Sequence, residues 1–132
     1  MSSRHPNTRR VLDLFAAFRS GDIAAVADVL SDDVTWRFPG RVGRLAGEHR
    51  GRNAVFAFLA DVMRLTERTF HLELESVVAD DDYAVVFFRG HGRRNGKALD
   101  NQTCLKMRLE QGKVVDVWEF VWDLYHVDDF WS

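Results

Sequence analysis

The chain has 132 residues, a length that predicts one domain, residues 1–132, with a single sizeable core. Its hydrophobic fraction of 46% and charged fraction of 29% are ordinary for a globular protein, and its net charge of −2 gives no electrostatic support for nucleic acid or an anionic membrane as a partner. The single cysteine, Cys104, excludes a disulfide within the chain, and the sequence has no zinc-like cluster, membrane-length apolar run or signal-peptide core, so we expect a cytoplasmic protein without a metal.

The first part of the chain has the apolar spacing of two short helices. Two stripes follow the i, i+3, i+4, i+7 pattern, and between them lie Gly21, typical of a helix end, and Asp22, typical of a helix cap. We therefore expect an αα-hairpin, whose stripes are Val11, Leu14, Phe15 and Phe18, followed by Ile23, Val26, Ala27 and Leu30.

A short strand, a long loop and a third helix are predicted next. Residues 34–38 alternate, with Trp36 on the apolar face. Residues 40–51 are rich in Gly and Arg and long for a simple connection, which indicates a lid or a pocket rim. Residues 53–65 carry a broad apolar stripe that includes Phe58 and is typical of a helix packed on a sheet.

The rest of the chain predicts antiparallel strands over residues 70–78, 83–93, 99–109 and 112–123. The clearest turn between them is Asn95-Gly96, a strong hairpin signal. Helices collected before a curled antiparallel sheet indicate an α+β fold.

The last predicted strand contains the most informative candidate, Glu119. Because side chains alternate across a strand, Glu119 shares one face with valines, while the other face is aromatic. A carboxyl group among valines must be paired or must hold its proton through desolvation, which is what a general acid or base requires. The alternative is that Glu119 faces solvent and the aromatic face forms the core. The two faces are Val115, Val117, Glu119, Val121 and Asp123, and Asp116, Trp118, Phe120 and Trp122.

The preceding strand favours Glu119 on the inside. Between residues 99 and 109 the odd positions are mostly apolar and the even positions charged or polar, so the valine face of the next strand should be concave. The inward face also carries Asn101 and Thr103, which bond either a ligand or neighbouring backbone. The aromatic face then lies outside, and we expect a homodimer to cover it through the convex side of the sheet.

The other candidates are weaker. His91, between two glycines at a strand end, is either a proton donor at the pocket rim or a plain rim residue. Trp36 could help hold a substrate oxygen. The glycines of the long loop do not form a phosphate-binding pattern, so we expect no cofactor. One core between the third helix and the sheet should bury Phe58, Leu59, Val62, Leu105, Val117 and Val121.

Five strings, taken with the element order, are typical of one family: TWRFPG at 35–40, AGEHRGRNAVFAFL at 46–59, VVADDDYAVV at 77–86, NGKALDN at 95–101 and GKVVDVWEFVWDLYHVDDFW at 112–131. In these the chain resembles the SnoaL-like, or polyketide cyclase-like, branch of the nuclear transport factor 2 and ketosteroid isomerase superfamily. The resemblance implies a cone-shaped α+β barrel, in which a strongly curved, mostly antiparallel sheet surrounds an apolar cavity closed by three helices from the N-terminal half. It also implies a homodimer packed sheet to sheet.

The resemblance further implies where a site should lie. Polyketide cyclases of this branch use an acid on the last strand and a histidine on the preceding strand. Here the acid position falls on Glu119, but the histidine position holds Leu105, and Arg37 stands where many members have histidine after the tryptophan. The implied function is a cofactor-free isomerase, cyclase or dehydratase for a hydrophobic cyclic or polyketide-like molecule, and the alternative is a non-catalytic ligand-binding or dimerisation module. Candidate substrate contacts are Trp36, Phe58, His91, Asn101 and Leu105.

Overall fold

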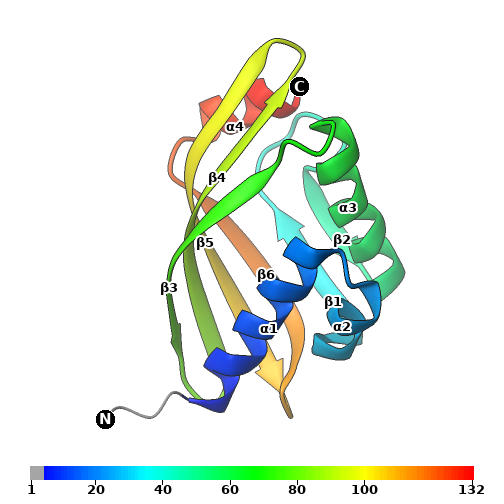
Figure 1. Ribbon diagram of the computed structural model, residues 1–132, viewed down its shortest axis with the longest axis vertical. Coiled ribbons are helices and arrows are strands. Elements are labelled where there is room, and N and C mark those ends of the chain that lie inside the picture. The colour runs from blue at the N-terminus through cyan, green and yellow to red at the C-terminus, as the bar shows by residue number, and fades with distance from the viewer. Residues whose placement is uncertain (1–4) are drawn as a thin grey trace.

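The computed structural model describes residues 5–132, which form one six-stranded sheet and four helices (Figure 1). The elements in chain order are α1 (Pro6–Ser20), α2 (Ile23–Val29), β1 (Leu30–Phe38), β2 (Gly47–Arg50), α3 (Arg52–Leu65), β3 (His71–Ala79), β4 (Tyr83–Arg94), β5 (Lys97–Glu110), β6 (Lys113–Val121) and α4 (Leu124–Trp131).

Local signals set the ends of the predicted αα-hairpin, which is confirmed. Gly21 ends α1 in the left-handed conformation with φ of 74°, and the Asp22 side chain caps α2 by accepting a hydrogen bond from the Ala25 amide at 3.1 Å. The hairpin is shorter than expected at its end, because Leu30 is already the first residue of β1.

The sheet has the strand order β2-β1-β6-β5-β4-β3. All neighbouring strands are antiparallel except β1 and β6, which run parallel. Figure 1 shows the sheet curving around α1, with α3 beside β1 and β2. Helix α4 packs against β5. The predicted fold class, a cone-shaped α+β barrel with a mostly antiparallel sheet, is therefore confirmed.

Two elements were not predicted. The segment 40–51, expected to be a loop, contains β2, which pairs antiparallel with β1 and sets His49 opposite Trp36. The chain after β6 forms α4, where the Asp123 side chain accepts a hydrogen bond from the His126 amide at 3.1 Å and thus caps the helix.

The core lies between the helices and the concave face of the sheet, as predicted. Phe58, Leu105 and Val117 are 3%, 2% and 0% exposed. Leu59 and Val121 are half-buried, because both line a cavity. The longest described helix, α1, has 15 residues, and within residues 5–132 no helix combines the length and apolarity of a membrane span.

Candidate active site

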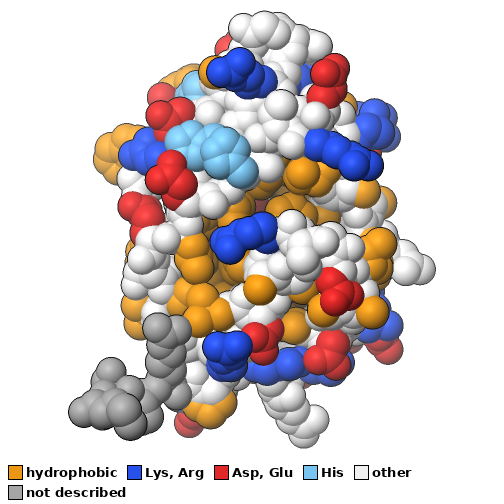
Figure 2. All heavy atoms as spheres, viewed as in Figure 1, with side chains coloured by type: hydrophobic (Ala, Val, Ile, Leu, Met, Phe, Trp, Pro, Cys, Tyr) orange, Lys and Arg blue, Asp and Glu red, His pale blue; other side chains and the backbone are white. Residues whose placement is uncertain are grey.

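A largely apolar cavity lies between the concave face of the sheet and helices α1, α3 and α4. The three helices were expected to come from the N-terminal half, but α2 contributes none of the described lining residues and α4, from the C-terminal end, lines the cavity instead. The centre of a water-sized sphere can move through a volume of about 80 Å³ inside this cavity. Figure 2 shows hydrophobic side chains lining a hollow in the surface between α1 and α3. Of the described residues that line the cavity, the only ones with amide, hydroxyl or carboxyl side chains are Asn101, Thr103 and Glu119.

Strand β6 places Glu119 on the cavity wall. Val117 is fully buried and Val121 lines the cavity, whereas Phe120 on the alternate face is 55% exposed. Leu105 of β5 lies directly opposite Glu119 in the sheet register. The carboxyl group is therefore surrounded by aliphatic side chains from its own strand and from the next one.

The predicted alternation fails at the start of β6. The pairing of β5 with β6 shifts by one residue between Arg108 and Leu109, so Val114 takes the inward position that was expected for Val115. Val114 is 0% exposed, whereas Val115 is half-buried. A β-bulge moves the side chains before it to the other face. Glu119 lies beyond the bulge and keeps the predicted face.

The indole of Trp36 holds one oxygen of Glu119. Trp36 Nε1 donates a hydrogen bond to Glu119 Oε1 at 3.1 Å. The Trp36 ring packs against Phe58, with ring centroids 5.5 Å apart, and is 7% exposed. Trp36 was expected to hold a substrate oxygen, but in the structure its N–H is bonded to the carboxyl group instead.

Burial changes the acidity of Glu119. Desolvation raises its pKa from the ordinary 4.5 to about 7, and the Trp36 hydrogen bond, which favours the anion, lowers the pKa by a smaller amount. Among the residues that the structure describes, Glu119 Oε2 has no hydrogen-bond partner. The group can therefore hold or release a proton near neutral pH, and one oxygen is available to a ligand.

Asn101 and Thr103 form a second polar group on the wall of β5. Each is 5% exposed, and Asn101 Nδ2 donates to Thr103 Oγ1 at 3.1 Å. Asn101 Oδ1 also accepts a long 3.4 Å contact from the Asp123 amide. The two side chains thus bond each other and nearby backbone while also lining the cavity.

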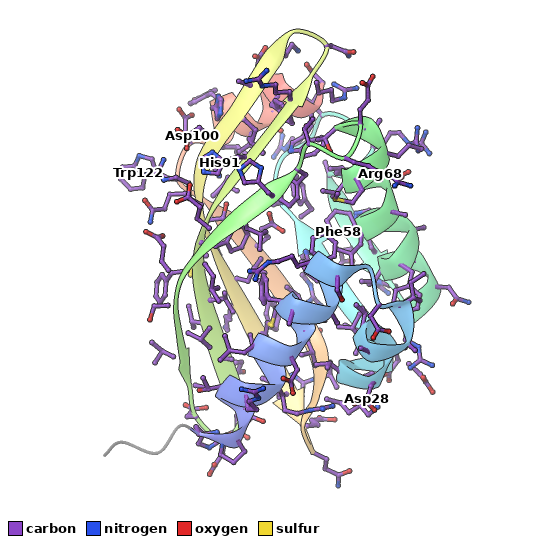
Figure 3. The ribbon with its side chains drawn as sticks, in the orientation of Figure 1. Asp28, Phe58, Arg68, His91, Asp100 and Trp122 are labelled. Atoms are coloured by element: carbon purple, nitrogen blue, oxygen red, sulfur yellow. The ribbon has the colours of Figure 1, made fainter. Side chains whose placement is uncertain are left out.

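The structure does not bring His91 to the cavity. Gly90 and Gly92 on β4 face inward, so His91 lies on the outer face, where its ring stacks on His71 at 4.9 Å and its Nε2 bonds Glu73. Figure 3 shows His91 and Trp122 on the outer side of the sheet, and Phe58 between α3 and the sheet. The expectation that His91 contributes to the pocket is therefore wrong, because strand alternation points it away.

Several residues in or next to the cavity wall were not predicted to be there. Phe15 and Phe18 of α1 belong to the recognised helical stripe, yet both face the cavity. Trp131 of α4 lines its end, and spacing with Val127 (i, i+4) could have revealed it. His49, in the segment predicted as a loop, packs its ring on Phe58 at 4.4 Å.

A model of the SnoaL-like domain matches residues 11–117 of this chain. The chain belongs to the SnoaL-like family. One relative, the uncharacterized protein Rv0034 of Mycobacterium tuberculosis, is 32% identical over 119 residues, which cover 89% of this chain and 90% of the relative. Among solved structures, Bal32a from a soil-derived mobile gene cassette is 35% identical with a TM-score of 0.92, covering 96% of this chain and 97% of Bal32a. A Xanthomonas campestris protein with a cystatin-like fold is 28% identical with a TM-score of 0.88, covering 96% and 98%.

The register gives a physical meaning to the SnoaL-like pattern. Leu105, at the position implied for the cyclase histidine, is paired directly with Glu119 across β5 and β6. A side chain there would reach the carboxyl group, since paired Cβ atoms lie about 5 Å apart. In this SnoaL-like chain an aliphatic group fills that place, and no described lining residue is a histidine.

Proposed function

We propose that the protein is a cofactor-free enzyme that transfers a proton on a hydrophobic, cyclic or polyketide-like small molecule. Glu119 is the general acid and base in isomerisation, aldol cyclisation or dehydration. The observation that carries the proposal is a carboxyl group on an apolar cavity wall whose pKa is raised to about 7. A general base is most effective when its pKa lies near the working pH.

The two oxygens of Glu119 have different roles in this proposal. Oε1 is fixed by the Trp36 indole, and Oε2 faces the ligand and removes a proton from the carbon next to a carbonyl group. In an isomerisation the same carboxylic acid returns the proton to another carbon. In an aldol cyclisation it gives the proton to the new alkoxide oxygen, and in a dehydration to the hydroxyl group that leaves as water, so none of these reactions consumes another reactant. Trp36 acts as a positioning residue, since its N–H orients the carboxyl group.

Thr103 and Asn101 are suited to bind the carbonyl oxygen. Thr103 Oγ1 accepts a hydrogen bond from Asn101, which leaves the hydroxyl hydrogen free to donate to a ligand. Thr103 is opposite Val121 and Leu105 is opposite Glu119. Thr103 and Glu119 are therefore diagonal neighbours on adjacent strands, roughly 7–8 Å apart. That spacing leaves room for a ring between them.

The test is the isomerisation of 3-cyclohexen-1-one to 2-cyclohexen-1-one, followed by the ultraviolet absorbance of the conjugated product. We expect the wild-type protein to accelerate the reaction and Glu119→Gln to lower the rate by at least about a hundredfold. Glu110→Gln, which removes the same charge at the exposed end of β5, is the matched control. Full activity in Glu119→Gln would contradict the proposed role.

Trp36→Phe gives an independent readout of the same site. It removes the one hydrogen bond that lowers the pKa of Glu119, so the pH midpoint of the rate should move upward. Trp131→Phe, which shortens another lining ring that has no bond to Glu119, should leave the midpoint in place.

A second candidate function is a non-catalytic binding module with the same cavity. The observation that favours it is Leu105, buried and paired with Glu119 where the cyclase pattern has a histidine. Such a module would be stabilised by small hydrophobic ligands and would not accelerate the isomerisation.

We also propose that two copies of the chain pair through the convex face of the sheet. Three of the exposed rings on this face, here called the outer aromatic patch, are Phe87, Phe120 and Trp122, with exposed fractions of 38%, 55% and 88%. Helix α4 leaves Phe120 and Trp122 uncovered. Contiguous exposed aromatic surface favours a protein partner, and a second copy presents the same patch.

A further inference from the structure

We propose that the cavity selects small hydrophobic molecules that carry one cationic amine, and that the ammonium group pairs with Glu119. This inference concerns the charge of the ligand. It goes beyond the proposed proton transfer, requires no chemical step, and applies to molecules that occupy Glu119 Oε2 in place of a reacting ketone.

The first observation is the absence of a positive charge in the cavity. None of the described residues that line it is Lys, Arg or His. The arginine nearest in sequence to Trp36, Arg37, points to the outer face and pairs with Asp116 at 3.0 Å and Glu48 at 3.1 Å. Arg89 likewise pairs with Asp100 outside. Within the described part of the chain, the anion of Glu119 therefore has no counter-ion.

The second observation is that one oxygen of the Glu119 carboxyl group lacks a hydrogen-bond donor among the described residues. Oε1 accepts the Trp36 indole N–H, and within residues 5–132 no donor reaches Oε2. Glu119 is half-buried on an apolar wall, where a carboxylate without a counter-ion is destabilised, and a ligand that brings the opposite charge and an N–H donor reduces that penalty. A ligand carboxylate would instead add a second unpaired anion.

The third observation is a group of aromatic rings that line the same cavity as Glu119. Trp36 and Phe38 project inward from β1, and the Phe58 ring lies 5.5 Å and 5.6 Å from them. The faces of aromatic rings carry negative potential and attract cations, most strongly where water is excluded. The aromatic rings and the Glu119 carboxylate thus both favour a positively charged ligand.

The pH dependence of binding follows from Glu119 alone. The elements packed around it, β1, β5, β6 and helices α1, α3 and α4, present no other titratable side chain to the cavity among the described residues. An ammonium ligand binds the ionised form, so its affinity should rise with pH until Glu119 is fully ionised. A neutral ligand that accepts a hydrogen bond from the protonated acid should show the opposite trend.

The experiment compares benzylamine, benzyl alcohol and benzoate, which have the same ring and differ in charge, by isothermal titration calorimetry. We expect benzylamine to bind the wild-type protein roughly tenfold more tightly than benzyl alcohol at about pH 8, with benzoate weakest. Lowering the pH from about 7 to about 6 should weaken benzylamine several-fold and should not weaken benzyl alcohol. Glu119→Gln should abolish the preference, and Glu110→Gln should retain it.

Equal binding of benzylamine and benzyl alcohol, tight binding of benzoate, or a preference that survives in Glu119→Gln would each overturn the inference. If benzyl alcohol binds and ketone isomerisation depends on Glu119 while benzylamine shows no advantage, the inference fails and the proposed function stands. If none of the three compounds binds, the inference is also wrong, and the cavity loses its support as a small-molecule site.

Discussion

The pKa of Glu119 is raised because apolar side chains replace water around its carboxyl group. No neighbouring anion contributes to this increase. Three residues earlier on the same strand, Asp116 lies on the outer face and is bonded to Arg37 and Arg108. The two carboxyl groups thus differ in environment although they share one strand. Strand alternation decides which of them meets solvent and cations and which meets the cavity.

Replacing Glu119 by Gln should change how stability depends on pH. The folded pKa of about 7 lies above the ordinary 4.5, so between these values the unfolded chain loses a proton that the folded protein keeps. The wild-type protein should therefore lose stability as pH rises through this window, by up to roughly 3 kcal/mol, and then level off. Glu119→Gln should lack this loss, which thermal unfolding from about pH 4.5 to about pH 8 would measure.

Glu110→Gln provides the reference, since it removes an exposed carboxylate and should follow the wild-type curve. A Glu119→Gln protein that is distinctly less stable than wild type at about pH 8 would show that the carboxylate is a paired structural anion. Such a result would also remove the main support for acid–base catalysis.

Glu119 is predictable from the sequence, but its partner Trp36 is not. Alternation and the apolar neighbouring strand suffice to place a carboxyl group on the inner face. The Trp36 contact joins residues 83 positions apart and depends on the parallel pairing of β1 with β6, which no local pattern reveals. The outward position of His91 was predictable, because it alternates on β4 with Gly90 and Gly92, which face inward.

Helices and strands with a strong apolar periodicity were predictable from the sequence. Features that depend on pairing with a neighbouring strand were not. Helices α1 and α3 carry long apolar stripes, and the hairpin turn at Asn95-Gly96 joins β4 to β5. Strand β2 has only four residues, Gly-Glu-His-Arg, with no apolar alternation, and it exists because β1 offers it an edge. The bulge in β6 depends likewise on the register with β5.

The segment before β2 is tied to α4 at Gly43, which gives a test of that contact. Gly43 has φ of +84°, and a Cβ atom there would lie 2.6 Å from the carbonyl oxygen of Trp131. Gly47 has φ of +106° but no atom within 4 Å of such a Cβ. Gly47→Ala should lose the roughly 1–2 kcal/mol that alanine costs in a left-handed conformation. Gly43→Ala should lose about 2 kcal/mol more, because its Cβ also clashes with Trp131.

Urea unfolding of the two alanine variants measures this difference directly. Equal losses would mean that α4 shifts freely away from Gly43, and the end of the cavity formed by Trp131 would then be adaptable. A larger loss in Gly43→Ala would show that the segment and the helix form one rigid wall.

The arrangement of the entire chain leaves the helices on one side of the sheet and the outer aromatic patch on the other. We expect light scattering at micromolar concentration to give the mass of two chains. Phe120→Glu should give the mass of one chain, because a charge at the centre of the patch would be buried without a partner. Ile23→Glu, which alters a 69% exposed residue of α2, should leave the dimer intact.

A wild-type mass equal to one chain would contradict the proposed pairing. A dimer that survives in Phe120→Glu and is lost in Ile23→Glu would place the interface on the helical side instead. Neither result would affect the cavity, since the patch and Glu119 lie on opposite faces of the sheet.

Strand β1, near the start of the chain, is completed in the sheet only by β6, near its end. During synthesis, Trp36 therefore leaves the ribosome long before Glu119. Until β6 emerges, the edges of β1 and β5 that pair with it have no hydrogen-bonded neighbour. Contacts between such distant residues form slowly, because a long loop must close first. The carboxyl group that defines the cavity thus arrives among the last parts of the fold, and a nascent chain that still lacks β6 depends on protection of two unpaired strand edges.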